Sequence, residues 1–245
     1  DTNIPDDGTA CTDDYCVAGV DYHPPSAGTC LINGAECFVA LEKNPADGCQ
    51  ICFPQESQTD WSPTLFRETF EAGDLGLMTN TTAEGPISWH VTNELASMSD
   101  YSAWFGDDTT GTYATGSRVH GQLVMPSVYL APDASHWLRF HLYLETEMFT
   151  STPLYDLLKV QAILNPDTNP QQIDLWDSTT HLGGTTWGQW ETIFLDVTAY
   201  SGYEVQFLFD FDSGDEQFNN YGGAYIDDVS VRTGCCVEDA DCNDG

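Results

Sequence analysis

Carboxylates set among cysteines at the two ends of the chain are the residues best suited to chemistry. Residues 1–16 read as the continuation of the motif that begins in residues 235–245, so a second copy placed head to tail would complete it. Oxygen ligands at this density suit a hard cation, which predicts calcium at the junction. The alternative is that both ends are exposed acidic linkers. The junction residues are Asp1, Asn3, Asp6, Asp7, Asp13, Asp14, Asp239, Asp241, Asn243 and Asp244.

Nine cysteines form the second reactive group. Six fall within residues 1–52, at spacings typical of small secreted modules, which predicts disulfides and an extracellular or cell-surface location. Many pairings are possible, and the sequence does not choose among them. The last two of the six form a CxxC that could indicate zinc or redox chemistry, but we expect a disulfide role. The six are Cys11, Cys16, Cys30, Cys37, Cys49 and Cys52.

An odd number of cysteines has a consequence for a repeated unit. If identical copies formed a linear array, at least one cysteine per copy would stay free or would bridge to another chain. The candidates are Cys235, Cys236 and Cys242.

The net charge of −33 results from 39 acidic and 6 basic residues. It argues against nucleic acid and anionic membranes as partners and makes cations the natural counterpart. Bound divalent ions or high salt would offset the self-repulsion. A salt-adapted, merely soluble acidic surface is the alternative to specific ion binding. No segment has the apolar length of a membrane helix, so we expect no direct membrane insertion.

Composition divides the chain into three segments that would position these groups. Residues 1–60 are cysteine-rich, acidic and punctuated by Pro and Gly, which predicts a loop-rich module held by cross-links. Residues 61–233 contain no cysteine and consist of short alternating runs between turn residues, which is typical of β-strands. Residues 234–245 are predicted to be a cysteine-bearing connector to a following copy.

Two runs in the middle segment alternate most clearly, at residues 137–144 and 203–211. Each would place four apolar side chains on one face of a strand. These side chains are Leu138, Phe140, Leu142 and Leu144 in the first run and Val205, Phe207, Phe209 and Phe211 in the second. Further strands are predicted near residues 65–70, 88–92, 103–106, 122–125, 156–164, 173–176, 191–197 and 224–231. So many short strands predict an all-β, two-sheet jelly-roll sandwich.

Three segments carry a resemblance to known families: 66–74 with its Phe-Glu pair, 102–113, and 223–231 with Ile-Asp-Asp-Val. Together they resemble the MAM-type and carbohydrate-module-like jelly rolls of bacterial secreted proteins. The resemblance implies a structural calcium bound by Glu71 and by Asp227 or Asp228, with help from Asp74 or from the pair Asp107 and Asp108. A cation would relieve the repulsion between carboxylates brought together from distant segments. The alternative is that Asp227 and Asp228 only cap the last strand.

The first segment resembles the cysteine-rich repeats of large bacterial cell-surface proteins, through 6–16, 28–37 and 44–54. It departs from them at residues 21–23, where such repeats often carry another cysteine before the His. The disulfide pairing of those repeats therefore does not transfer to this chain.

Motifs of catalysis are absent from the sequence. It contains no GxSxG elbow, no HExxH and no glycine-rich phosphate loop. The histidines are isolated and are expected to be surface or packed residues. Glu145 and Glu147 could imitate a glycosidase pair, although a sequence does not reveal the separation that this chemistry needs. We therefore predict that the chain is not an enzyme.

Aromatic residues are the remaining functional signal. Four lie in or near expected loops, where exposed rings could stack on sugars, and the alternative is that they fill the core. They are Trp176, Trp187, Trp190 and Tyr221. Asn80 begins an Asn-Thr-Thr glycosylation pattern.

The first hypothesis is an extracellular structural or adhesive unit of a surface fibre, stabilised by disulfides and Ca2+, whose partners are neighbouring copies of itself. The alternative is a lectin-like module of a larger secreted protein, with surface glycans as its partners. A third possibility is a repeat spacer that has no ligand.

Overall fold

The structure is a computed structural model that describes residues 6–17, 20–40, 42, 44–45, 50, 52–54, 57–62, 64–97, 100–132, 134–147 and 156–234. The chain divides into two compact units, Phe66–Val231 and a smaller one of Asp1–Leu65 with Arg232–Gly245. The predicted ligands Asp239 and Asp241 lie outside the described residues. So do Cys49, Cys235, Cys236 and Cys242, and their predicted disulfide roles stay predictions.

Two short hairpins make up the regular structure of the smaller unit. In the first hairpin, β1 (Tyr15–Val17) pairs with β2 (Val20–Tyr22), and in the second, β3 (Thr29–Ile32) pairs with β4 (Glu36–Val39). The only buried apolar cluster described here is small: Cys30, Ile32 and Cys52, with Phe38 and Trp61 packed against it. Such a core needs covalent support, as the composition indicated.

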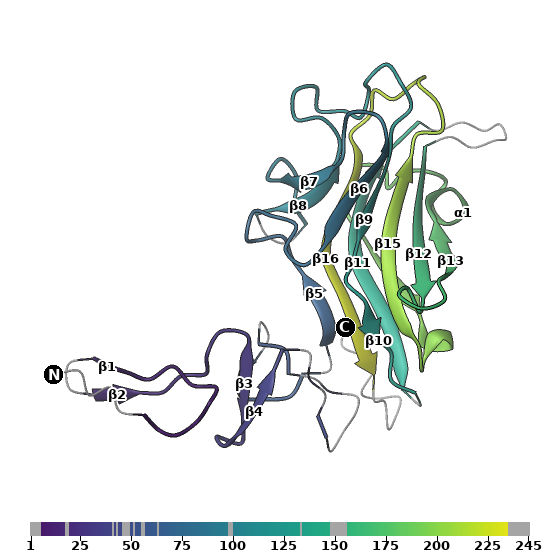
Figure 1. The fold of residues 1–245 in the computed structure, drawn as a ribbon. Helices are drawn as coiled ribbons and strands as arrows, with labels where there is room; N and C mark the ends of the chain where they lie inside the picture. Colours follow the sequence, from purple (N-terminus) through teal and green to yellow (C-terminus); the bar gives the residue numbers. More distant parts are fainter. Residues whose placement is uncertain are drawn as a thin grey trace. The chain divides into compact units, whose positions relative to one another are not determined.

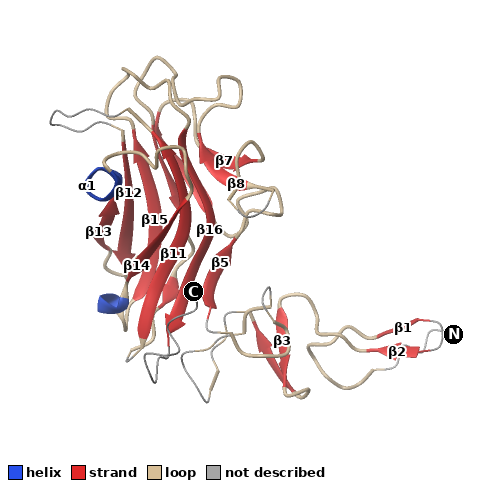
Figure 2. Ribbon diagram, turned by 180° about the vertical axis from the view of Figure 1, so that it is seen from behind, coloured by secondary structure: helices blue, strands red, loops and turns tan. Residues whose placement is uncertain are grey.

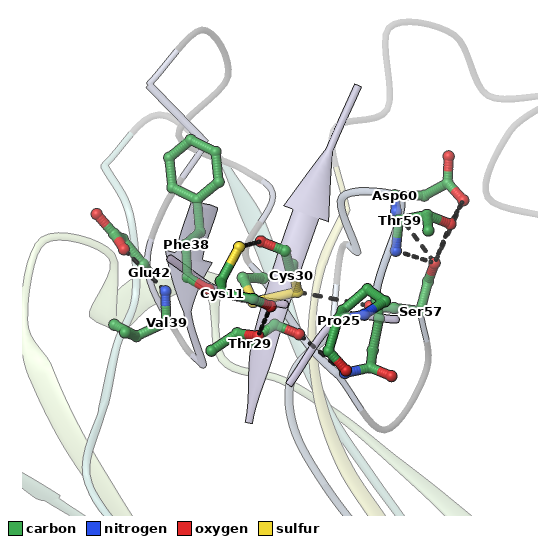
Figure 3. Close-up of a disulfide and its surroundings, with 12 residues drawn as sticks. Cys11, Pro25, Thr29, Cys30, Phe38, Val39, Glu42, Ser57, Thr59 and Asp60 are labelled. Carbon is green, nitrogen blue, oxygen red and sulfur yellow. Dashed lines mark hydrogen bonds between the residues drawn. A yellow bond between two sulfur atoms is a disulfide. The ribbon is translucent and has the colours of Figure 1, made fainter. Parts of the chain in front are cut away.

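Disulfides supply that support. Cys11 is bonded to Cys37, and Cys30 is bonded to Cys52. Figure 3 shows the surroundings of these cysteines, where the hydroxyl of Thr29 donates to the carbonyl of Cys11. Cys16 differs from the prediction, because it is exposed and forms no disulfide within the described part of the chain. Among the described residues, the unpaired cysteine lies in the first hairpin.

The larger unit consists of two six-stranded sheets. One has the order β13-β12-β15-β9-β6, with β10 paired to β15 (Figure 1). Its strands are β6 (Thr79–Glu84), β9 (His120–Val124), β10 (Val128–Tyr129), β12 (Leu157–Leu164), β13 (Gln171–Asp177) and β15 (Glu204–Asp212). The other sheet has the order β14-β11-β16-β8-β7, with β5 paired to β16 (Figure 2). Its strands are β5 (Thr64–Glu68), β7 (Trp89–Thr92), β8 (Ser102–Phe105), β11 (Ser135–Glu145), β14 (Glu191–Asp196) and β16 (Gly223–Gly234).

The core forms between the two sheets because alternate residues of each strand point inward. All eight apolar side chains predicted for the inner faces of β11 and β15 are buried, with 0% exposure. Phe140 of β11 meets Phe209 of β15 edge to face, at 4.9 Å between ring centroids, which joins the two layers. The predicted jelly-roll sandwich is confirmed.

Several elements were not predicted, among them strand β6 and helix α1. Strand β6 is exposed at every residue, so it lacks the apolar alternation that reveals a strand. Helix α1 (Ser178–Leu182) has only five residues, too few for a helical period, and it is delimited by caps. The side chain of Asp177 accepts from the backbone N–H of Thr180 at its start, and Gly183 adopts a left-handed φ of 68° at its end. No described helix is long and apolar enough to cross a membrane.

Candidate functional site

A pocket of about 570 Å3 lies on the sheet that contains β8, β11 and β16. These three strands are neighbours in the order β11-β16-β8, and each contributes one aromatic side chain to the pocket. Trp104 comes from β8, Tyr225 from β16 and Tyr143 from β11. All three point away from the core because each alternates with inward-facing apolar neighbours along its strand.

Ring packing gives the pocket a rigid aromatic floor. Trp104 and Tyr225 are paired across the strands and stack with a centroid separation of 5.3 Å and an interplanar angle of 8°. Tyr143 meets Tyr225 edge to face, at 5.8 Å and 87°. Both arrangements are favoured by the aromatic quadrupole. Trp104 is only 1% exposed, so it supports the floor more than it offers a surface.

The loop before β16 forms one wall of the pocket with Asn220, Tyr221 and Gly222. The indole Nε1 of Trp104 donates to the carbonyl of Gly222 at 2.7 Å, which holds the loop to the floor. Gly223 has a φ of 82°, and a Cβ there would lie 2.4 Å from the carbonyl oxygen of Phe105. Glycine is therefore required for this close approach. Tyr221 is left 42% exposed at the pocket edge.

Carboxylates supply the polar groups of the pocket, from Glu94, Asp108 and Glu145. The hydroxyl of Tyr143 donates to Oε1 of Glu145 at 2.7 Å. Burial, together with this carboxylate, raises the pKa of Tyr143 to about 12. Burial and then the charge of Glu145 raise the pKa of Tyr225 to about 12 as well. The pocket therefore combines uncharged aromatic hydroxyls with a negative potential.

The four aromatic residues singled out from the sequence have different positions. Tyr221 lines the pocket, and Trp190 lies beside it, with its ring centroid 5.8 Å from that of Tyr143. Trp187 is 71% exposed, with a left-handed φ of 57°. The suggestion that Trp176 stacks on a sugar is wrong, and the alternative of core packing holds. Trp176 is 4% exposed and packs edge to face on Phe140 in the core.

Sequence reasoning missed the three residues of the floor. Tyr143 lies within the run at residues 137–144, on the face opposite the predicted apolar one. A strand face that meets solvent usually carries polar residues. An aromatic residue at this position was the signal that the sequence offered. Trp104 and Tyr225 can be recognised as part of the pocket only when the order of the strands in the sheet is known. The two glutamates that could imitate a glycosidase pair are separated, since Glu145 lines the pocket and Glu147 is 4% exposed in the interior.

Two of the residues that the family resemblance implied as calcium ligands are held by one loop. The backbone N–H of Ser97 donates to Oδ2 of Asp227 at 2.9 Å. The N–H groups of Asp100 and Tyr101 donate to Oε1 of Glu71 at 3.2 and 3.0 Å. Asp227 is fully buried, and burial is the main cause that raises its pKa to about 6. The buried carboxylate of Asp227 is therefore costly to ionise, whereas Glu71 is exposed.

The other implied ligands have local partners. Asp228 lies 3.7 Å from a guanidinium nitrogen of Arg67. Asp74 accepts from the N–H of Gly76 at 2.9 Å, and Asp107 accepts from the N–H of Thr109 at 2.8 Å. These hydrogen bonds are those of ordinary Asx turns.

In the smaller unit, the acidic residues named from the sequence separate into two groups. Asp6 accepts from the N–H of Gly8, and Asp13 accepts from the hydroxyl of Ser26. Asp7, Asp14 and His23 instead offer ligand atoms within 4.8 Å of one another. Nδ1 of His23 lies 2.7 Å from Oδ1 of Asp14, and this hydrogen bond is the main cause that raises the pKa of His23.

Comparisons with known proteins found distant matches among solved structures. No protein-family model matches the sequence, and no curated protein matches it. Among solved structures, the K3 cleaved adhesin domain of Lys-gingipain from Porphyromonas gingivalis is 14% identical, with a TM-score of 0.47, over 69% of this chain and 98% of that one. TmCBM61, solved in complex with β-1,4-galactotriose, is 14% identical, with a TM-score of 0.42, over 66% and 92%. The mannan-recognising module TmCBM27 is 11% identical, with a TM-score of 0.37, over 68% and 95%.

Proposed function

We propose that this chain is an extracellular glycan-binding module whose sugar ligand occupies the pocket on β11, β16 and β8. The observation that carries the proposal is the pocket itself: about 570 Å3, with an aromatic floor and a few converging polar groups. This is the general character of small-ligand sites. The two disulfides support a location outside the reducing cytoplasm.

The chemistry of the pocket selects among sugars. The apolar C–H face of a pyranose can stack on the exposed ring of Tyr221 and the half-buried ring of Tyr143. Its hydroxyls can donate to the carboxylates of Glu94, Asp108 and Glu145. Carboxylates accept hydrogen bonds and do not donate them when ionised. Neutral and amino sugars are therefore the preferred ligands, and uronic acids and sulfated sugars are repelled.

The test is a titration of the full chain with neutral, amino-bearing and acidic oligosaccharides, followed by calorimetry. We expect saturable binding to a neutral or amino sugar, weakened at least tenfold by Tyr221→Ala. Tyr203→Ala is the matched control, because Tyr203 is also 42% exposed but lies in the turn before β15. Absence of binding to every neutral and amino sugar by folded protein, or equal loss in both variants, would reject the proposal.

Trp187→Ala tests how far the binding surface extends. Trp187 precedes Gly188, where an added Cβ would lie 3.8 Å from the hydroxyl of Tyr143. A long glycan that continues past Tyr143 would reach this 71% exposed ring. We expect Trp187→Ala to weaken binding of long oligosaccharides and to leave binding of disaccharides unchanged.

We also propose that Ca2+ bridges Glu71 and Asp227. Support comes from their attachment to one loop and from the cost of ionising Asp227, to which the charges of Asp228 and Glu71 contribute after burial. Two carboxylates leave room for the carbonyl and water ligands that calcium also uses. The fibre hypothesis stays a prediction, since its junction residues in 235–245 lie outside the described part of the chain.

A further inference from the structure

A second group of carboxylates lies where three strands of the larger unit end. Glu147 follows β11, Asp156 precedes β12, and Asp215 follows β15. Strands β12 and β15 are antiparallel neighbours with Leu157 opposite Asp212, so these ends are adjacent. The backbone N–H of Glu147 donates to Oδ2 of Asp156 at 3.1 Å, which joins the end of β11 to them.

Buried oxygen atoms without partners are the key observation. Oδ2 of Asp156 accepts from the hydroxyl of Tyr113 at 2.5 Å and from Glu147, whereas its Oδ1 is buried with no hydrogen-bond partner among the described residues. Oε2 of Glu147 and Oδ1 of Asn219 are also buried and also lack a hydrogen-bond partner among the described residues. The three residues are 0%, 4% and 2% exposed, respectively. An unsatisfied buried carboxylate oxygen is costly, which indicates a missing partner.

The residues around these oxygens supply negative charge. Burial, followed by the charge of Asp215, raises the pKa of Glu147. The charges of Glu147 and Asp215 add to the burial that raises the pKa of Asp156. Arg118, a base close in sequence to Tyr113, is bound by Asp212 and Glu84 instead. A bound cation would satisfy the oxygens and offset the repulsion together.

The loop that carries Asp215 is held in place by hydrogen bonds of its own. The carbonyl of Asp215 accepts from the hydroxyl of Ser213 at 2.8 Å and from Nδ2 of Asn219 at 3.1 Å. Asp215 is partly exposed, which gives an ion a route from solvent. Asp156 has a left-handed φ of 58°, and strain of this kind persists only when the surroundings demand it.

We infer that the unpartnered side-chain oxygens of Glu147, Asp156 and Asn219 bind a divalent cation through oxygen atoms alone. Oxygen-only donors select hard cations, and the irregular loop ligands suit Ca2+ better than the strict octahedron of Mg2+. This site is distinct from the one proposed at Glu71 and Asp227, because it uses other residues, which lie next to β11, β12 and β16.

The site also connects to the pocket. Tyr113 donates its hydroxyl to Asp156, and its backbone N–H donates to the carbonyl of Tyr221 at 3.3 Å. The loop from Asp215 continues directly into Asn220 and Tyr221 of the pocket wall. A cation would therefore order the wall before a sugar arrives. This coupling rests on the proposed glycan function, whereas the cation site does not.

The experiment measures cation binding by the full chain without any sugar. The protein is stripped with a chelator and titrated with TbCl3, whose emission tyrosine sensitises, and the bound ion is then displaced with CaCl2. Glu147→Gln and Asp156→Asn each remove one ligand charge, and Asn tolerates the left-handed backbone of Asp156. Asp167→Asn is the matched control, since this exposed residue lies in the turn at the far end of β12. Glu71→Gln removes a ligand of the other proposed site, so it shows which binding event belongs to which site.

We expect Glu147→Gln and Asp156→Asn to weaken one binding event at least tenfold, or to remove one equivalent of Ca2+. Asp167→Asn should bind as the unchanged protein does, and Glu71→Gln should retain this event. Equal affinities and stoichiometries in all variants would overturn the inference. So would a protein that binds no Tb3+ or Ca2+, in which the two carboxyl groups hold protons instead. Failure to bind sugars would not affect this result.

Discussion

The substitution Asp156→Asn gives a prediction whose sign depends on calcium. Burial raises the pKa of Asp156 from 3.8 to about 7 in the folded protein. The folded state then holds the proton more tightly than the unfolded state, so stability falls as pH rises from about 4 to about 7. At pH 8 in a chelator, ionised Asp156 costs roughly 4 kcal/mol of folding free energy.

Asparagine removes this cost and keeps the local contacts. Its side-chain oxygen can accept from Tyr113 and Glu147, and its Nδ2 takes the place of the oxygen that lacks a partner. We therefore expect Asp156→Asn to raise the free energy of unfolding by up to roughly 4 kcal/mol at pH 8 in EDTA. The gain should vanish near pH 4, where Asp156 is protonated in both states.

In saturating CaCl2 the order should reverse. The unchanged protein gains the binding free energy of the ion, and the variant, which lacks a ligand, gains less. The assay is urea unfolding followed by tryptophan fluorescence at pH 4, 6 and 8, with EDTA or CaCl2. Asp167→Asn controls for the loss of one surface charge. A variant that is less stable than the unchanged protein in EDTA at pH 8 would refute the reasoning, because the buried carboxylate would then be stabilising without a cation.

Three further predictions concern the core, the disulfides and the first calcium proposal. Trp176→Ala should lower the free energy of unfolding by about 3–5 kcal/mol, measured by denaturant melts, because a large core side chain is lost. Equal stability would place Trp176 outside the core. Replacing Cys30 and Cys52 together by Ser should lower the stability of the smaller unit by about 3 kcal/mol, seen as faster limited proteolysis of residues 1–65. Unchanged cleavage would contradict a structural role for this bond. Asp227→Asn should lower the melting temperature more in CaCl2 than in EDTA, because the pKa of about 6 makes its ionised form costly without a cation. The same shift in both buffers would argue against calcium at Asp227.

Local patterns were sufficient to predict the sandwich. Alternation along β11 and β15 is a property of consecutive residues, since side chains of a strand point to opposite faces in turn. The runs at 137–144 and 203–211 therefore revealed their buried faces without knowledge of any partner. Strand β6 had no apolar face to reveal, and its existence follows only from its pairing with β9.

The pocket and the second carboxylate group depended on the tertiary structure. Trp104, Tyr143 and Tyr225 are far apart in sequence, and the order β11-β16-β8 alone brings them together. Trp176 and Tyr221 look alike as aromatics near turns, but one packs in the core and the other edges the pocket.

The sequence by itself determined composition, charge and strand periodicity, and through them the fold class and a cross-linked first module. Only the tertiary structure decided which carboxylates become neighbours. Nothing in the sequence distinguishes Glu147, Asp156 and Asp215 from other acidic residues. The fold brings the ends of β12 and β15 together and joins the end of β11 to them. The physical reason is that periodicity is local, whereas burial, charge repulsion and ligand geometry depend on contacts between residues distant along the chain.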